Sequence, residues 1–302
     1  MSSFDLADKK TFIILNPVAG RLDSKMVRQR LVGILEEHRM TYEIIETCKG
    51  DDLHKMVEDA LGGDFERFIA VGGDGTVSGA ASGLTGTDIP LIIIPTGTSN
   101  ALAKFLEIPV GTEDSFSWWL SESLNKVVDA MQVDHRHFFL NVSLGFSSNT
   151  LKVVNRQEKR RLGSLIYLLT GLQRLVGISN HSYQVTIDGG LNTRRCSEVV
   201  IANMGIAHFD PIRLNPEIRM DDGKLSVCFI RAKNLLDYLR IFGSLISRQK
   251  EKSSQLECKD AFQSIEIEVD QRLPIQADGE VIGYTPVKVD LIPSAASFKV
   301  PA

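Results

Sequence analysis

Two glycine-rich stretches hold the residues best suited to chemistry. The first reads Gly72-Gly73-Asp74-Gly75-Thr76, and the second reads Pro95-Thr96-Gly97-Thr98-Ser99-Asn100. Each follows an apolar run typical of a buried strand and opens a helix-like run. Glycine at such a turn lets backbone N–H groups approach an anion, and the helix N-terminus behind it favours negative charge. The two turns, about 25 residues apart, therefore predict one polyphosphate site at the edge of one parallel sheet.

Asp74 places a carboxylate among these phosphate-facing amides. A carboxylate beside a phosphate is repulsive unless a cation lies between them or the carboxylate acts on a proton. One interpretation is therefore a nearby Mg²⁺ ion, and the other is a tight turn in which Asp74 caps a helix. The loop is neither a Walker motif nor a dinucleotide fingerprint, because no Gly-Lys-Ser/Thr follows and Ser78 stands at the third glycine position.

A third turn, Asn16-Pro17-Val18-Ala19-Gly20-Arg21, closes the first apolar run. Gly20 allows close approach, and the Arg21 guanidinium can bind phosphate through two hydrogen bonds. The Pro95–Asn100 stretch also resembles a hydrolase elbow, but His181 and His208 lie in no persuasive context for a serine hydrolase.

Asp278-Gly279-Glu280 is a pair of carboxylates around a glycine. Its usual meaning is an exposed hairpin. The functional interpretation is that one carboxylate accepts the proton of a substrate hydroxyl in a cleft between domains.

Strand-like and helix-like segments alternate in the first part of the chain. Alternation of this kind predicts a doubly wound, mostly parallel sheet with ligands beyond the carboxyl ends of its strands. The expected strands are Thr11–Leu15, Thr41–Thr47, Arg67–Gly72 and Pro90–Pro95. The expected helices are Asp23–His38, Asp51–Leu61, a helix from Thr76, and Ser99–Leu106.

The pattern changes near Val133 to period-two alternation, as in Ser182–Asp188, Ser264–Asp270 and Val287–Leu291. Such alternation predicts a β-rich antiparallel sandwich. We expect an α/β domain over residues 1–132, a sandwich domain over 133–293, and a tail at 294–302 that returns to the first domain.

Composition narrows the class of protein. The 302 residues carry a net charge of −4, which argues against a nucleic-acid binder. Hydrophobic residues make up 43% of the chain, which argues against disorder. Four scattered cysteines suggest buried free thiols in a reducing cytoplasm. No run is long enough to span a bilayer. Leu162–Val176, preceded by Lys159-Arg160-Arg161, and Leu235–Ser247 are each either a helix packed on the sheet or an interfacial helix that meets anionic lipid.

With these pieces assembled, the chain resembles the diacylglycerol kinase catalytic-domain family, including bacterial soluble lipid kinases and the related sphingosine kinases. The resemblance covers essentially the whole chain. Its segments, in the order of the family, are Asn16-Pro17 with Gly20, Gly72–Thr76, Pro95–Asn100, Asn141-Val142-Ser143-Leu144-Gly145-Phe146 and Asp278-Gly279-Glu280.

The resemblance implies an α/β domain that binds ATP with Mg²⁺ and a β-rich domain that holds a lipid. The residues expected to bind the nucleotide are Asn16, Arg21, Thr47, Gly72, Gly73, Asp74, Gly75, Thr76, Ser78, Gly97, Thr98 and Asn100. Glu280 or Asp278 is expected to act as the base, with Asp74 as a further catalytic residue. A structural Mg²⁺ site matches Asp222 with the carbonyls of Arg219 and Lys224.

Three positions depart from the family pattern: Ala101, Ser147 and Ser226 each stand where the family often has Asp. Ala101 removes a carboxylate from the phosphate site, leaving Asp74 and Asp129, and Ser226 weakens the structural-metal match. We expect a lipid kinase with a cytoplasmic, membrane-peripheral location, no nucleic-acid partner, and homodimerisation left open. The alternatives are an NAD kinase-like enzyme and a nucleotide-binding regulator without catalysis.

Overall fold

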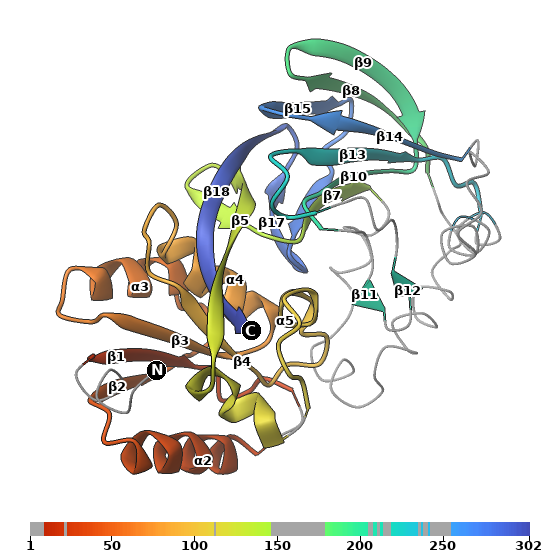
Figure 1. The fold of residues 1–302 in the computed structure, drawn as a ribbon. Coiled ribbons are helices and arrows are strands. Elements are labelled where there is room, and N and C mark those ends of the chain that lie inside the picture. The colour runs from red at the N-terminus through yellow and green to blue at the C-terminus, as the bar shows by residue number, and fades with distance from the viewer. Residues whose placement is uncertain are drawn as a thin grey trace. The chain divides into compact units, whose positions relative to one another are not determined.

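The structure is a computed structural model. It describes residues 9–20, 23–111, 113–145, 179–204, 208–209, 212–213, 219–234, 237, 241 and 255–302. Two compact units are present: Met1–Val128 with Ser294–Ala302, and Asp129–Pro293 (Figure 1). The domain boundary expected near Val133 falls at the end of the strand in which the first unit ends.

A parallel sheet forms the centre of the first unit. Its strands are β1 (Thr11–Leu15), β2 (Tyr42–Glu46), β3 (Arg67–Gly72) and β4 (Leu91–Pro95), in the order β2-β1-β3-β4. The final residues of β18 (Val287–Pro301) extend it, with Phe298 pairing in parallel with Leu91. β1, β3 and β4 are buried along their whole length, as expected of strands that are covered on both faces.

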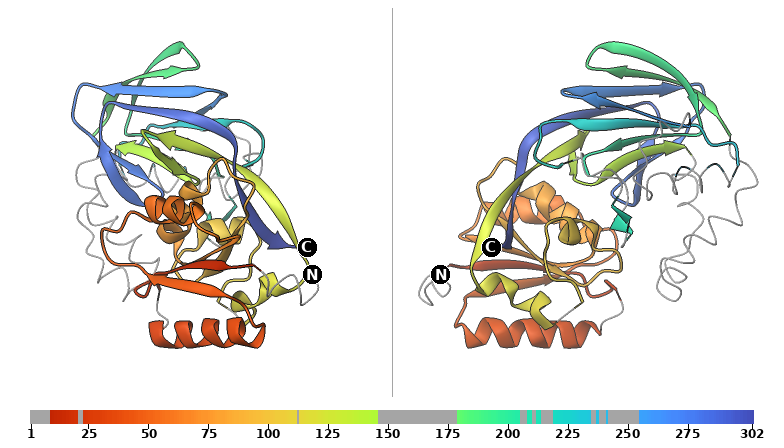
Figure 2. Two further views of the ribbon diagram at one scale, coloured as in Figure 1. Left: turned by 90° about the vertical axis from the view of Figure 1, so that its left-hand side faces the viewer. Right: turned by 45° about the vertical axis from the view of Figure 1, so that its right-hand side comes forward.

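Helices cover this sheet on both sides, with α2 on one face and α3 and α4 on the other, as Figures 1 and 2 show. The helices are α2 (Ser24–Glu37), α3 (Leu53–Leu61), α4 (Asp74–Gly83) and α5 (Ala101–Phe105), followed by the 3₁₀ turns η1 (Glu113–Phe116) and η2 (Trp118–Leu120). Asp23 and Asp52 accept backbone N–H bonds and so fix the starts of α2 and α3. Gly79 and Gly83 leave room for Leu53 and Val57, because a Cβ at either glycine would collide with them.

The second unit is a two-sheet antiparallel sandwich, which confirms the predicted fold class. One layer is the antiparallel end, β18-β15-β8-β9, of the ten-stranded sheet that begins with β2, and the other is a six-stranded sheet with the order β14-β13-β10-β7-β16-β17. The strands between β4 and β18 are β5 (Ser123–Val133), which begins in the first unit, β6 (Arg136–Phe138), β7 (Asn141–Gly145), β8 (His181–Ile187), β9 (Gly190–Cys196), β10 (Glu198–Ala202), β11 (His208–Phe209), β12 (Ile212–Arg213), β13 (Leu225–Ile230), β14 (Leu256–Ala261), β15 (Ser264–Val269), β16 (Pro274–Ala277) and β17 (Glu280–Tyr284). Of these, β11 and β12 pair as a separate two-stranded sheet. Apolar side chains of both sheets, such as Ile265 and Val227, form one buried cluster.

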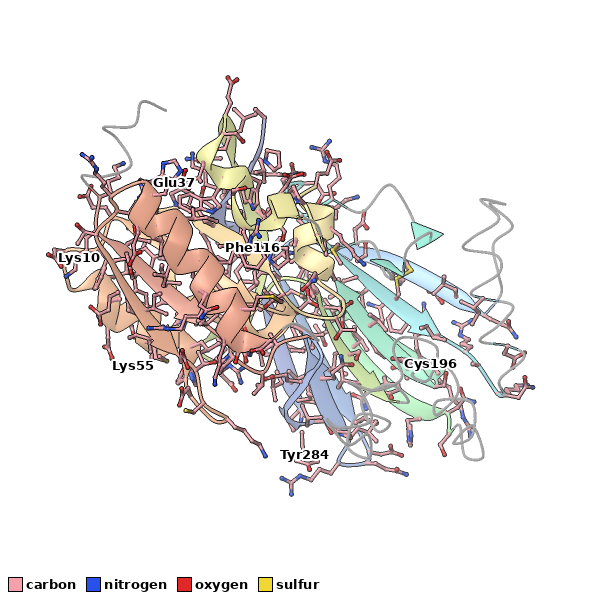
Figure 3. All side chains as sticks on the ribbon, turned by 90° about the horizontal axis from the view of Figure 1, so that it is seen from below. Lys10, Glu37, Lys55, Phe116, Cys196 and Tyr284 are labelled. Atoms are coloured by element: carbon pink, nitrogen blue, oxygen red, sulfur yellow. A yellow bond between two sulfur atoms is a disulfide. The ribbon has the colours of Figure 1, made fainter. Side chains whose placement is uncertain are left out.

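The cysteines correct the expectation of four free thiols. Cys228 and Cys258 face each other on β13 and β14 and form a disulfide. Cys48 is free and exposed, whereas Cys196 is free and buried in the second unit (Figure 3). Burial raises the pKa of the Cys196 thiol to about 12, so this side chain stays protonated and acts as a small apolar residue.

Two helix-like stretches were considered above for membrane contact. Residues 159–176 and most of 235–247 lie outside the described residues. Within the part of the chain that the structure covers, no helix combines the length and hydropathy that crossing a bilayer requires.

Candidate active site

The turn after β1 is tied to the glycine loop through Asn16. Its backbone N–H donates to the Val71 carbonyl at 2.9 Å, and its Nδ2 donates to Thr76 Oγ1 at 2.9 Å. Its Oδ1 accepts the Val18 N–H and closes the turn. Gly20, at φ +64°, lies so close to the Thr96 carbonyl that a Cβ there would collide with it. The first predicted turn therefore packs on both other turns, while Arg21 lies outside the described residues.

The glycine loop presents the N-terminus of α4 without a side-chain cap. Gly73 is the N-cap residue, has an extended backbone, and carries no capping side chain. Gly72 admits no Cβ, because one would lie 2.5 Å from the Thr76 side chain. A helix start that no side chain caps, approached by glycine backbone, has the features of an anion site. Thr76 and Ser78 are buried, and Gly75 is exposed.

The second glycine turn touches the first. A Cβ on Gly97 would lie 2.5 Å from Gly73 Cα, so only glycine lets the two backbones meet. The Thr96 N–H donates to the Gly72 carbonyl at 2.9 Å. The sequence-based prediction that the two turns meet at one edge of the sheet is therefore confirmed for the backbone.

Buried oxygen atoms without partners lie at this contact. Asn100 adopts the left-handed conformation at φ +49°, and its Nδ2 donates to the Gly97 carbonyl at 2.9 Å. Within the described part of the chain, Asn100 Oδ1 and Thr96 Oγ1 are buried and have no hydrogen-bond partner. Because buried oxygens are nearly always satisfied, these two indicate a donor or a cation supplied by a ligand. Thr98 beside them is exposed.

Asp74 caps a helix, but not its own. Its Oδ1 accepts the Leu102 N–H at 3.3 Å, at the start of α5. Burial raises the pKa of the Asp74 carboxyl, and backbone N–H groups of Leu102, Ala101 and Asn100 oppose that rise. The interpretation that Asp74 caps a helix is thus confirmed, although the helix is α5 and not α4. The Mg²⁺ interpretation stays a prediction, and a cation at this carboxylate would offset the cost of burying its charge.

Thr47 lies at the end of β2, in the same unit. Its N–H donates to the Leu15 carbonyl at 2.9 Å, and the residue is buried. Thr47 thus lies just beyond the pair β1–β2, at the same sheet edge as Asn16, since the two strands are parallel.

The predicted structural-metal residues belong to the second unit. Burial raises the pKa of the Asp222 carboxyl; Lys224 opposes this rise, and Asp129 adds to it. Within the residues that the structure places, Asp222 Oδ1 is buried without a partner. Asp129 Oδ2 accepts the Gly223 N–H at 2.8 Å, so this carboxylate lies at the same turn. An unpartnered buried carboxylate oxygen near a second carboxylate fits a cation.

The rest of the predicted metal site is less distinctive. The Arg219 side chain is paired with Asp221 and that of Lys224 with Asp260. Because both side chains are cations, only the backbone carbonyls of Arg219 and Lys224 could bind a metal ion. No cluster of three His, Cys, Asp or Glu side chains suited to a metal occurs among the residues described.

Asp278 and Glu280 occupy different positions on one hairpin. Asp278 is buried, and its carboxylate accepts the N–H groups of Phe139, Leu140 and Asn141 at 2.9–3.1 Å. Glu280 is exposed and begins β17. Of the two candidate bases, Asp278 has both carboxylate oxygens engaged by backbone amides.

Asn203, which contacts the segment that holds Asp278, was not predicted from the sequence. Asn203 is fully buried after β10, and its Nδ2 donates to the carbonyls of Asp129 and Phe139. No motif or periodicity surrounds Asn203. The one signal in the sequence is that a polar residue directly follows an apolar strand.

Two family models together match nearly the whole chain. Residues 10–133 match the family described as "Diacylglycerol kinase catalytic domain". Residues 140–299 match "YegS C-terminal NAD kinase beta sandwich-like domain".

Individual relatives span nearly the whole chain. The "Diacylglycerol kinase" of Bacillus subtilis (strain 168) is 26% identical over 92% of both chains. The "Probable lipid kinase YegS-like" of Alcanivorax borkumensis is 26% identical over 97% of both. A solved structure, "Crystal structure of a putative diacylglycerol kinase from Bacillus anthracis str. Sterne", has a TM-score of 0.80 at 24% identity, covering 96% of this chain and 94% of that one.

Proposed function

The chain belongs to the diacylglycerol kinase catalytic-domain family, and we propose that it is an ATP-dependent lipid kinase. The reaction would transfer the γ-phosphoryl group of ATP to a hydroxyl of a lipid such as diacylglycerol. The observation that supports it best is the contact of the two glycine turns, Gly73 against Gly97, at the start of α4 where no side chain caps the helix. Phosphoryl transfer depends mainly on positioning and charge neutralisation, which such a site can supply.

The first unit would hold the nucleotide. The amides at the start of α4 and the Thr76 hydroxyl would bind phosphate oxygens, while Asn16 keeps Thr76 in place through its 2.9 Å hydrogen bond. Thr47, Ser78 and Thr98 are the further contacts proposed. Asn100 Oδ1 and Thr96 Oγ1 would meet donors or a cation that arrives with the nucleotide.

Magnesium is the metal that fits these oxygens. Asp74, Asn100 and Thr96 are the residues that would face it, directly or through water. A bound Mg²⁺ would neutralise charge on the phosphates. Asp222 would hold a separate, structural cation in the second unit, with backbone carbonyls of Arg219 and Lys224.

Glu280 is the proposed base. Its carboxylate would accept the proton of the lipid hydroxyl as the oxygen attacks phosphorus. Asp278 is the weaker choice, because its two oxygens already accept three backbone N–H bonds.

A nucleotide-binding regulator is the second candidate, and Ala101 favours it. The family often has Asp at this position, so one carboxylate is absent beside the phosphate site. The remaining carboxylate, that of Asp74, accepts the Leu102 N–H at the start of α5 through its Oδ1. Such a protein would bind ATP without transferring phosphate.

One screen separates these functions. Labelled ATP with Mg²⁺ is offered together with diacylglycerol, phosphatidylglycerol, sphingosine or NAD, each in mixed micelles or buffer. Label in a lipid supports the lipid kinase, and label in NAD supports an NAD kinase-like enzyme. ATP binding by calorimetry without label transfer to any acceptor supports the regulator, and no ATP binding contradicts all three.

A lipid acceptor implies a transient contact with a membrane surface, which we also propose. Vesicle sedimentation with and without anionic lipid tests it. Absence of binding to both vesicle types would favour a soluble acceptor.

A further inference from the structure

The turn between β16 and β17 has a backbone that few residues adopt. Asp278 and Gly279 have φ angles of +45° and +87°. Two consecutive positive φ angles are typical of a type I′ hairpin turn, for which Asp-Gly is a preferred pair. Glu280 follows directly, paired across the hairpin with Ala277. The position of Glu280 therefore depends on how firmly this turn is held.

The Asp278 side chain holds the turn against a third strand. Oδ2 accepts the Phe139 N–H at 2.9 Å, and Oδ1 accepts the N–H groups of Leu140 and Asn141 at 2.9 and 3.1 Å. The Asp278 N–H donates in return to the Asn141 carbonyl at 3.0 Å. Four hydrogen bonds thus join the tip of the hairpin to the start of β7, and the residue is only 8% exposed.

Asn203 holds the same segment through its carbonyl groups. Its N–H donates to the Leu140 carbonyl at 3.1 Å, and its Nδ2 donates to the carbonyls of Phe139 and Asp129 at 3.0 and 2.7 Å. The residue is fully buried. Segment 139–141 therefore gives its N–H groups to Asp278, while two of its carbonyls accept from Asn203.

The open end of the hairpin is fixed as well. The Leu273 N–H donates to Thr285 Oγ1 at 3.0 Å, and the Thr285 N–H donates to the Leu273 carbonyl at 2.9 Å. Arg272 stacks over the Tyr284 ring at 4.5 Å, near the end of β17 (Figure 3). Hydrogen bonds therefore anchor both ends of the hairpin on which Glu280 lies.

We propose that Asp278 and Asn203 are positioning residues that hold Glu280 for proton transfer. This inference rests on the proposed function. The carboxylate of Asp278 acts through the turn rather than on substrate, and Asn203 acts through segment 139–141. A displacement of about 1 Å at a reacting group can slow a reaction about 100-fold. Losing this support should therefore lower kcat and leave KM for ATP nearly unchanged.

The chain contains a matched control in the same unit. Asp188 and Gly189, at φ +48° and +82°, form the turn between β8 and β9. The Asp188 carboxylate accepts the N–H groups of Phe262, Gln263 and Ser264 at 2.8–3.0 Å, and its N–H donates to the Ser264 carbonyl. The residue after that turn is Gly190, so the same support there holds no acidic side chain.

The experiment compares Asp278→Ala, Asp278→Asn, Asn203→Ala and Asp188→Asn in the full chain. Readouts are kcat, KM for ATP, the pH profile of kcat, and folded fraction by circular dichroism. Asn tolerates positive φ and keeps an oxygen that can accept two of the three bonds. We expect kcat per folded molecule to fall about 100-fold in Asp278→Ala and about 10-fold in Asp278→Asn and Asn203→Ala. In these three variants, KM for ATP and the acid limb of the pH profile of kcat should stay unchanged. The control Asp188→Asn should keep the wild-type kcat.

Three results would overturn the inference. If Asp278→Asn and Asp278→Ala lose the same factor in kcat, and the acid limb disappears from the pH profile of kcat, then Asp278 is the base. Wild-type kcat in Asp278→Asn and Asn203→Ala would make the support purely structural. If neither Asn203→Ala nor Asp278→Ala folds, hydrogen exchange of residues 280–284 in Asp278→Asn decides: exchange no faster than in the wild type contradicts positioning. A wild-type chain that transfers no phosphate refutes the proposed function itself, which separates the two failures.

Discussion

The turns at Asp188 and Asp278 are built alike, yet only the turn at Asp278 is followed by an acidic residue, the proposed base Glu280. In both, an aspartate with positive φ precedes a glycine, accepts three successive backbone N–H groups, and donates its own N–H to the third residue. Asp188 is exposed and precedes Gly190, whereas Asp278 is buried and precedes Glu280.

This comparison distinguishes an aspartate that anchors a turn from a carboxylate proposed to act on substrate. Since both aspartates perform the same backbone task, three amide bonds by themselves do not mark a catalytic carboxylate. What distinguishes the second turn is the residue that follows it and Asn203 behind its anchoring segment. Of the two carboxylates around Gly279, Asp278 is an anchor of the turn, and Glu280 is the one we propose as the base.

The largest expected effect is on Glu280 itself. Glu280→Gln should lower kcat by about 1,000-fold, because it removes the proposed base and leaves the turn intact. Steady-state transfer of labelled phosphate to diacylglycerol measures it. Glu268→Gln, an exposed change on β15, is the control and should leave kcat unchanged. Activity retained in Glu280→Gln would remove the chemical difference between the two turns.

Asp74 extends the comparison to a third aspartate that accepts backbone N–H groups. Asp74→Asn should lower kcat by about 100-fold, since the carboxylate that would face Mg²⁺ is lost. Its control is Asp88→Asn, an exposed change in the same unit. Full activity of Asp74→Asn would contradict the proposed metal contact.

The same variant has an expected stability effect with a definite sign. Because burial raises the pKa of Asp74, the folded chain loses stability as pH rises through that pKa. Without nucleotide, Asp74→Asn should therefore be more stable than the wild type at pH 7 and should approach it near pH 3. Denaturant unfolding at the two pH values measures this, and a destabilised variant at pH 7 would contradict it.

The glycines of the two turns give a smaller, paired effect. Gly279→Ala and Gly189→Ala should each cost about 1–2 kcal/mol of unfolding free energy, because both φ angles are positive and neither new Cβ meets an atom within 4 Å. Only Gly279→Ala should also lower kcat per folded molecule, by about 10-fold. Urea unfolding and kinetics on the same samples test the pair; equal kcat would indicate that the turn next to Glu280 tolerates displacement.

The smallest effect concerns the exposed turn. Partial burial raises the pKa of Asp188, but the N–H groups of Phe262, Ser264 and Gln263 together hold it below its usual value. A lowered pKa stabilises the fold above the unfolded pKa of about 3.9, and this contribution is lost as pH falls through the folded pKa. Asp188→Asn should thus be slightly less stable than the wild type at pH 7, with the gap closing in acid. Thermal unfolding from pH 7 to pH 3 checks it, and a gap that is the same at both pH values would contradict it.

The sequence predicted the parallel strands and the glycine turns to within a few residues. Arg67–Gly72 matches β3, and Leu91–Pro95 falls inside the expected Pro90–Pro95. These elements were predictable because apolar runs and glycine turns are local signals. The β17 strand, the disulfide of Cys228 with Cys258, and the role of Asn203 were not predicted, because each depends on segments that pair far apart in sequence.

The sequence alone determined which residue types stand at the turns: glycines that let backbones approach, an aspartate within the first glycine loop, and two carboxylates around Gly279. Only the tertiary structure decided what each carboxylate does. Asp74 reaches Leu102, and Asp278 reaches residues 139–141, over separations that no local pattern encodes. The physical reason is that a buried carboxylate must find hydrogen-bond donors, and the fold decides which backbone amides lie within reach.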